Sequence, residues 1–177
     1  MKQGRGSKGE AFTRALKELS EARVPYRVMT FEARERTAEE VARETAFPLS
    51  QVIKTLLVQG ASKKYYLALC PGDCQVNLKA LARALGEKTM EMALREDVPK
   101  VTGYWIGGVS PLATHRPLPV AMEESIFGKP EIAISAGQWG CQAILRPSDL
   151  KHHLGSRAIV ASFAQPIGTS SIPSKGE

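Results

Sequence analysis

Several residue types that often reveal a function are scarce in this chain. Its 177 residues include three cysteines, three histidines and only 6% aromatic side chains. No apolar run approaches the roughly 20 residues of a membrane-spanning helix, and the basic first residues lack the apolar core of a signal peptide. Cys70, Cys74 and Cys141 are an odd number, which is typical of a reducing compartment. These absences predict a cytoplasmic protein without a membrane partner.

The scarcity of histidine and cysteine also limits the chemistry. Cys70 and Cys74 have no second pair of ligands at a metal-binding spacing, so no metal is expected. A serine–histidine–aspartate triad would need His115, because His152 and His153 fall on a predicted surface helix. No phosphate-binding Gly-Lys-Ser/Thr loop is present. An enzyme with this sequence is therefore expected to work without a metal, a cofactor or a side-chain nucleophile.

The chain carries a moderate excess of positive charge. It has 24 Lys and Arg against 18 Asp and Glu, a formal net charge of +6. This suits a phosphate-bearing partner without requiring one; there is no long basic run and nothing that indicates DNA. Composition predicts one folded domain at 11–163, with a disordered tail at 1–10 and a flexible tail at 164–177.

The most distinctive segment is a glycine-rich loop. It follows residues 102–106, an aromatic and β-branched run that predicts a strand. Glycine lets a backbone approach a ligand closely, and such a loop can direct main-chain N–H groups at an oxyanion. A plain tight turn is the alternative. The small and turn-forming residues of the loop are Gly107, Gly108, Ser110 and Pro111.

Two further strands carry candidate site residues. Lys54 lies within the apolar run 52–58, where it either protects a sheet edge or points into a polar pocket. Ser135 and Gly137 follow the alternating strand that begins at Glu131. Small residues at a strand end leave room for a ligand, or for a neighbouring helix.

Periodicity predicts short helices mixed with short strands, an α+β domain. A first helix is expected at 11–22, and Thr37 and Glu40 form a capping box for a second that ends near Thr45. Asn77 and Gly86 bound a third, and Ser148 is expected to cap a fourth. The predicted strands cover 26–31, 52–58, 64–70, 88–92, 102–106, 118–121, 131–135, 141–145 and 158–163.

Five motifs in order resemble the YbaK/EbsC family, freestanding relatives of the editing domain inserted in bacterial prolyl-tRNA synthetase. They are Gln-Val-Ile-Lys-Thr-Leu at 51–56, Cys-Pro-Gly-Asp at 70–73, Leu-Lys-Ala-Leu-Ala-Arg-Ala-Leu-Gly at 78–86, Thr-Gly-Tyr with Gly-Gly-Val-Ser-Pro-Leu at 102–112, and Ser-Ala-Gly at 135–137. The resemblance covers roughly 11–163. It implies a mixed, partly closed, barrel-like sheet surrounded by short helices. It also implies trans-editing hydrolysis of mischarged tRNA, most often Cys-tRNA(Pro).

The resemblance assigns roles to individual residues. Lys54 matches an essential lysine, and Gly107 and Gly108 match a loop whose backbone faces the ester carbonyl, so these three are the catalytic candidates. His115 and Arg116 are candidates for RNA contact. The implied substrate-binding residues are Phe31, Thr37, Thr55, Ser110, Pro111, Ser135, Gly137 and Gln142.

Some residues depart from the family pattern. Phe31 stands where some cysteine-specific members have Tyr, and Thr37 where some have Phe. Gln138 and Trp139 replace a basic pair that is common after the Ser-Ala-Gly turn. These differences leave the amino acid open, with alanine as the other common specificity.

Three interpretations therefore stand at this point. The first is a deacylase acting on the acceptor end of tRNA, with prolyl-tRNA synthetase as a further partner. The second is a catalytically silent module that binds the tRNA acceptor or an aminoacyl-adenylate. The third is a small-molecule binder unrelated to tRNA, which salt-dependent tRNA binding would exclude.

Overall fold

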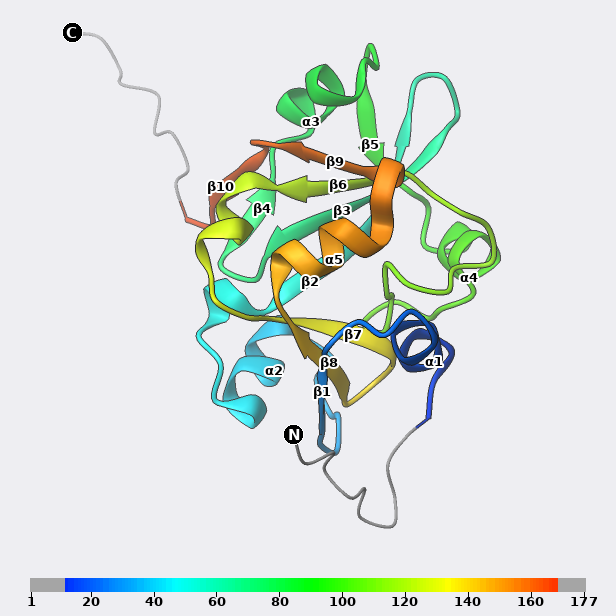
Figure 1. Ribbon diagram of the computed structural model, residues 1–177. Coiled ribbons are helices and arrows are strands. Elements are labelled where there is room, and N and C mark those ends of the chain that lie inside the picture. The colour runs from blue at the N-terminus through cyan, green and yellow to red at the C-terminus, as the bar shows by residue number, and fades with distance from the viewer. Residues whose placement is uncertain (1–11, 169–177) are drawn as a thin grey trace, which may run out of the picture.

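Short helices surround three sheets in Figure 1, a computed structural model that describes residues 12–168. The expected tail at 1–10 and residues 169–177 of the expected C-terminal tail lie outside this range. The α-helices are α1 Arg14–Glu21, α2 Ala38–Thr45, α3 Leu78–Leu85, α4 Asp97–Thr102 and α5 Pro147–Leu154. The 3-10 helices are η1 Leu49–Gln51, η2 Glu124–Gly128 and η3 Gly155–Arg157.

The largest sheet has five strands in the order β5-β2-β3-β6-β9, and it is mixed. β2 pairs antiparallel with β3 and β5, whereas β3–β6 and β6–β9 are parallel. Its strands are β2 Ile53–Gly60, β3 Tyr65–Pro71, β5 Met90–Met92, β6 Val120–Glu123 and β9 Ala158–Ala161.

The two smaller sheets are antiparallel. One has the order β1-β8-β7, from β1 Arg27–Thr30, β7 Ile132–Gln138 and β8 Cys141–Leu145. The other pairs β4 Cys74–Val76 with β10 Ala164–Pro166. An isolated parallel bridge between Val52 and Ala133 joins the start of β2 to β7. The α+β class is confirmed, and within residues 12–168 the five-stranded sheet meets the β1-β8-β7 sheet at this bridge without closing into a barrel.

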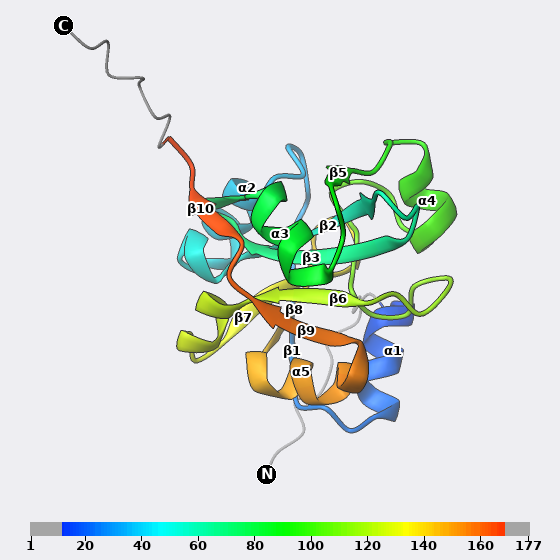
Figure 2. The ribbon, with the colours of Figure 1, turned by 90° about the horizontal axis from the view of Figure 1, so that it is seen from above.

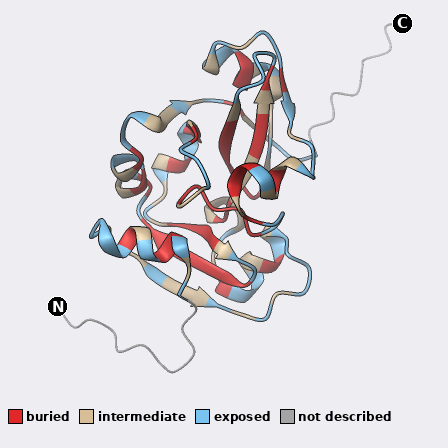
Figure 3. Ribbon diagram, turned by 90° about the vertical axis from the view of Figure 1, so that its right-hand side faces the viewer, coloured by how far each residue is buried: buried red, intermediate tan, exposed pale blue. Residues whose placement is uncertain are grey.

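The central strands β2 and β3 are covered on both faces. Successive strand residues face opposite sides of a sheet, so Leu57 joins the larger hydrophobic cluster and Val58 the smaller one beneath α3. Figure 2 shows α3 on one side of this sheet and α5 and α1 on the other. Buried segments in Figure 3 accordingly run along the inner strands, with exposed residues at the turns. Across the described residues, no helix is long and apolar enough to cross a bilayer.

Most predicted helix ends are confirmed by their hydrogen bonds. Asn77 Oδ1 accepts from Ala80 N at 3.1 Å, and Gly86 ends α3 in the left-handed conformation. Thr37 Oγ1 accepts from Glu40 N at 3.2 Å at the start of α2. The expected cap at Ser148 is wrong, because α5 begins at Pro147 and Arg146 occupies the cap position.

The strand predicted at 102–106 is also wrong. Thr102 is the last residue of α4, and Gly103 follows with φ 79° as the left-handed cap. The Thr102 hydroxyl donates to Val98 O at 2.6 Å and accepts from Tyr104 N at 3.1 Å, which turns the chain out of the helix. Trp105 then begins an exposed loop. The aromatic residues reflect packing and exposure at this turn rather than an extended strand.

Residues 164–166, expected within a flexible tail, instead form β10. They pair with β4, which sequence reasoning did not identify. The buried carboxylate of Glu123 holds the approach to β10, since its Oε2 accepts from Phe163 N at 2.7 Å and Ala164 N at 2.8 Å. The ordered chain therefore extends past the expected boundary at 163.

Candidate functional site

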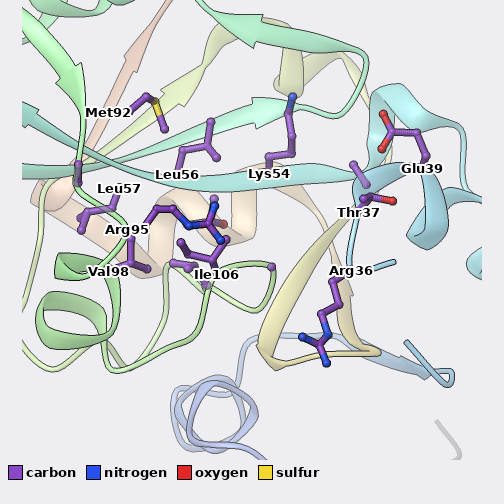
Figure 4. Close-up of a pocket in the computed structure, with 15 residues that line it drawn as sticks. Arg36, Thr37, Glu39, Lys54, Leu56, Leu57, Met92, Arg95, Val98 and Ile106 are labelled. Atoms are coloured by element: carbon purple, nitrogen blue, oxygen red, sulfur yellow. The ribbon is translucent and has the colours of Figure 1, made fainter. Parts of the chain in front are cut away.

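A cavity of about 570 Å³ opens beside β2. On one edge β2 pairs with β3 along most of its length, but on the other β5 pairs only with Val58–Gly60. On that side, the stretch Lys54–Leu56 does not pair with β5, and it forms part of the cavity wall. Figure 4 shows the loop before α2 on one side of this wall and the loops around α4 on the other.

Lys54 lies on the cavity wall and is half-buried. Its ammonium group donates a hydrogen bond to the main-chain oxygen of Cys74, in the neighbouring strand β4. Of the two interpretations of this lysine, the structure favours the pocket, because Lys54 lines the cavity and its ammonium group is hydrogen-bonded to the protein. The hydrogen bond restrains the long side chain and holds its positive charge beside the cavity.

Thr55 is the next residue of the wall. Its hydroxyl oxygen is buried and has no hydrogen-bond partner among the described residues. Buried polar atoms nearly always have a partner, and an exception calls for an explanation such as a ligand. Thr55 therefore places a buried hydroxyl without a partner among the described residues at the cavity wall.

The glycine-rich loop divides into two parts. Gly107 lines the cavity with φ 87°, a conformation that favours glycine. Gly108 does not line it, and its N–H donates to Trp105 O at 2.9 Å. Ser110 and Pro111 are buried away from the cavity, where Ser110 Oγ accepts from Leu112 N at 3.3 Å. Gly107 can meet a ligand directly, while Gly108, Ser110 and Pro111 shape the turn.

Trp139 holds the glycine-rich loop from the turn between β7 and β8. Its Nε1–H donates to Ile106 O at 3.0 Å. The Arg36 guanidinium carbon lies 3.4 Å from the centroid of its ring. A Cβ at Gly107 would lie 3.2 Å from Arg36 Cβ and 3.4 Å from Trp139 Nε1. The loop that carries Arg36, the glycine-rich loop and the β7–β8 turn, which are distant in sequence, therefore meet at one corner of the cavity.

Glu40 shapes the loop that carries Arg36. Only 3% of this residue is exposed, and its carboxylate accepts from the main-chain N–H groups of Arg34 at 2.6 Å, Glu35 at 2.9 Å and Arg36 at 2.6 Å. Burial opposes ionisation, but the three N–H donors and the nearby Arg43 outweigh it and lower the pKa of Glu40 below its usual value of 4.5. Glu40 thus bonds to this loop and not to the Thr37 N–H that the capping box predicted.

The other predicted residues lie away from the cavity lining. Ser135 Oγ accepts from Gly137 N at 3.2 Å, and a side chain on Gly137 would collide with the Tyr104 ring. Gln142 is buried opposite Ser135 in β8, and Phe31 N donates to Gly140 O at 2.9 Å. Ser135, Gly137 and Gln142 lie in the β1-β8-β7 sheet, and Phe31 directly follows its strand β1.

The two candidates for RNA contact are both exposed. His115 N donates to Thr102 O at 3.2 Å, and the Arg116 guanidinium carbon lies 5.7 Å from the Tyr65 ring centroid. Neither residue lines the cavity. Of the predicted site residues, the cavity wall brings together Thr37, Lys54, Thr55 and Gly107.

Sequence reasoning missed several cavity residues. Charged Arg36, Arg95 and Glu39 lie on ordinary polar segments, with no motif to mark them. The lining carries three positively charged side chains, Arg36, Lys54 and Arg95, and one negatively charged side chain, Glu39. It therefore attracts an anion. The apolar residues that were missed are Ala38, Leu56, Leu57, Met92, Ala93, Val98, Ile106 and Val109.

The cysteines are poorly suited to act as nucleophiles. Burial raises the pKa of Cys70 to about 12, and burial with a hydrogen bond to Asp73 raises the pKa of Cys74 to about 11. Both thiols are protonated near neutral pH, whereas the thiolate is the reactive form. Among residues 12–168, no three His, Cys, Asp or Glu side chains are grouped so as to hold a metal ion.

Comparisons with known proteins agree on a family. Residues 32–152 match the aminoacyl-tRNA editing domain. Over 137 residues the chain is 33% identical to the Enterococcus faecalis protein named "Putative Cys-tRNA(Pro)/Cys-tRNA(Cys) deacylase EbsC", covering 76% of this chain and 84% of that one. It is 31% identical over 81 residues to the proline–tRNA ligase of Thermosipho africanus, covering 46% of this chain and 14% of the ligase.

Solved structures share the fold. One described as "a putative trans-editing enzyme for prolyl tRNA synthetase" superposes with a TM-score of 0.76 at 28% identity, covering 88% of this chain and 99% of that chain. The hypothetical protein APE2540 gives a TM-score of 0.78 at 23% identity, covering 85% of this chain and 99% of its own.

Proposed function

Because this chain belongs to the aminoacyl-tRNA editing domain family, we propose that it hydrolyses the ester that joins a wrongly attached amino acid to tRNA. The observation that carries the proposal is the position of Lys54, a restrained positive charge on the wall of a cavity that lies within the matched residues. A cationic lining suits the phosphates at the 3′ end of tRNA.

The proposed reaction needs positioning more than a protein nucleophile. Water adds to the ester carbonyl, the carbon–oxygen bond to the ribose breaks, and the amino acid and the free ribose hydroxyl are released. An ester of this kind is already activated, so orientation and stabilisation of the developing oxyanion can supply the acceleration. The Lys54 charge and the Gly107 backbone line the same cavity, and either can act on the carbonyl oxygen or an adjacent phosphate.

The amino acid in this proposal is small. Cysteine is our first choice, since one relative is named for Cys-tRNA(Pro) and Cys-tRNA(Cys), and alanine is the second. Thr55 lies on the cavity wall with a buried hydroxyl that has no partner among the described residues, and we assign it the contact with the amino group or side chain of such a residue. The synthetase site that charges tRNA discriminates between amino acids that differ by one methylene only about 10–200-fold. A second, hydrolytic site is therefore needed to remove the wrong amino acid.

The test is a deacylation assay with Cys-tRNA(Pro), Ala-tRNA(Pro) and correctly charged Pro-tRNA(Pro), with and without prolyl-tRNA synthetase. We expect hydrolysis of one mischarged substrate and sparing of Pro-tRNA(Pro). Salt-dependent tRNA binding without hydrolysis of any of the three would instead identify a silent acceptor-binding module. Equal hydrolysis of all three would contradict an editing role.

A further inference from the structure

Both tryptophans of this chain are exposed. Trp139 is 37% exposed and Trp105 is 68% exposed. Trp139 is nevertheless fixed in place, because its indole N–H donates to Ile106 O at 3.0 Å. A large aromatic ring that is held in place and left partly open to solvent offers a flat surface on which a planar ligand can stack.

The surroundings of Trp139 define how its ring is presented. The pyrrole edge faces the glycine-rich loop, where Cβ atoms built on Gly107 and Gly108 would lie 3.4 Å from Nε1 and 3.3 Å from Cδ1. The guanidinium carbon of Arg36 lies 3.4 Å from the ring centroid. In Figure 4 the Arg36 side chain extends away from Lys54 toward the β7–β8 hairpin. The pair therefore forms a planar, positively charged surface at the rim of the cavity.

Planar surfaces of this kind suit nucleobases. Proteins recognise unpaired RNA bases by stacking them on aromatic rings or on guanidinium planes. A positive charge beside the stack also compensates the phosphate of the same nucleotide. We infer that Arg36 and Trp139 form a stacking platform for the unpaired terminal base of the RNA whose aminoacyl ester enters the adjacent cavity. This inference rests on the proposed function for the identity of the RNA.

Fluorescence can isolate Trp139. In a Trp105→Phe protein, Trp139 is the sole tryptophan. We expect a short single-stranded RNA ending in CCA to quench its emission, and the same RNA with an abasic 3′ residue to quench it far less. The reciprocal Trp139→Phe protein, which reports from Trp105, is expected to change little. No quenching by the CCA-ending RNA, or equal quenching by the abasic RNA, would overturn the inference.

Binding constants distinguish contact from structural support. We expect Trp139→Leu to weaken binding of the CCA-ending RNA about tenfold, equivalent to about 1.4 kcal/mol, and to leave binding of the abasic RNA unchanged. Trp139→Phe keeps an aromatic face but loses the indole N–H, and is expected to retain the preference for the base. Equal weakening toward both RNAs would mean that Trp139 only supports the loop, and would refute the platform.

Two further results bear on the identity of the ligand. Quenching by AMP as strong as that by the CCA-ending RNA would overturn the RNA assignment in favour of a free adenylate. Neither RNA carries an amino acid, so this experiment is independent of hydrolysis. A protein that shows base-dependent quenching but no deacylation would therefore refute the proposed function alone.

Discussion

The ammonium group of Lys54 is hydrogen-bonded to the main-chain oxygen of Cys74, on a strand that pairs with neither edge of β2. The contact uses the backbone of Cys74 and not its thiol. It therefore tolerates a change of the Cys74 side chain, but it depends on the position of β4. Lys54 is held by the fold itself rather than by a carboxylate that would neutralise it.

Loss of Lys54 should affect catalysis more than folding. We expect Lys54→Ala to lower single-turnover deacylation at least tenfold, about 1.4 kcal/mol of transition-state stabilisation, with a thermal midpoint close to that of the parent. Lys54→Arg keeps the charge but not the compact ammonium group, and should recover only part of the rate. Lys151→Ala, an exposed lysine on α5, is the matched control. Full activity in a folded Lys54→Ala protein would remove Lys54 from the mechanism.

Removal of the unpartnered Thr55 hydroxyl should have opposite effects on stability and on activity. Thr55→Val replaces a buried oxygen without a partner by a methyl group of similar size, so we expect unfolding free energy to stay equal or rise by up to about 1 kcal/mol. If the hydroxyl binds substrate, kcat/KM should fall at the same time. Thr55→Ser is the control that restores the hydroxyl. A less stable Thr55→Val protein would show that the hydroxyl has a structural partner.

The two glycines of the loop should differ when substituted. Gly107→Ala must hold a side chain at φ 87° and 3.2 Å from Arg36, so we expect at least a tenfold lower single-turnover rate and some loss of thermal stability. Gly108→Ala meets Trp139 at 3.3 Å without the backbone strain, and its rate should fall less. Binding of uncharged tRNA measures any general damage. Normal rates for both variants would make the loop a simple turn.

The pKa of Glu40 predicts a pH dependence of stability. Its folded-state pKa is lowered, so ionised Glu40 stabilises the protein at neutral pH, and this contribution disappears as pH falls below about 4.5 through the folded value. We expect Glu40→Gln to melt at a lower temperature than the parent at pH 7, and the difference to shrink in acid. Glu44→Gln, exposed on the same helix, is the control. A difference that is constant from pH 7 to pH 3 would contradict this assignment.

The raised pKa values of Cys70 and Cys74 predict that neither of these protein thiols acts as a nucleophile in the reaction. We expect Cys74→Ser to deacylate at the parental rate, since the main-chain oxygen that binds Lys54 is unchanged. Prolonged incubation with EDTA should also leave the rate unaltered. Loss of activity on chelation that added zinc restores would overturn the metal-free mechanism.

Local patterns predicted the parts of the fold that depend on local interactions. The caps at Thr37 and Asn77 were readable because each acts on residues three positions away. The short strands β4 and β10 were not, because three residues carry no usable alternation and their pairing spans about 90 positions. The strand predicted at 102–106 was wrong because β-branched and aromatic residues are frequent both in strands and at packed turns.

The candidate site was predictable only in part for a similar reason. Lys54 stood out as a charge in an apolar run, and Gly107 as part of a glycine cluster. The pairing of Arg36 with Trp139 did not, because an arginine in a polar loop is ordinary and the ring it stacks on is 103 positions away. Their juxtaposition follows from tertiary structure, through the Glu40 carboxylate and the β7–β8 turn.

The register of β10 has a consequence for the order in which the protein matures. Cys74, whose oxygen binds Lys54, pairs with Pro166, and Ile167 N donates to Asp73 O at 3.1 Å. On the ribosome, β4 emerges long before the segment that pairs with it, and contacts between such distant segments are slow to form. A nascent chain can thus fold its central sheet while the support for Lys54 is still incomplete. Competence for hydrolysis would then be acquired late in synthesis, after most of the hydrophobic core has formed.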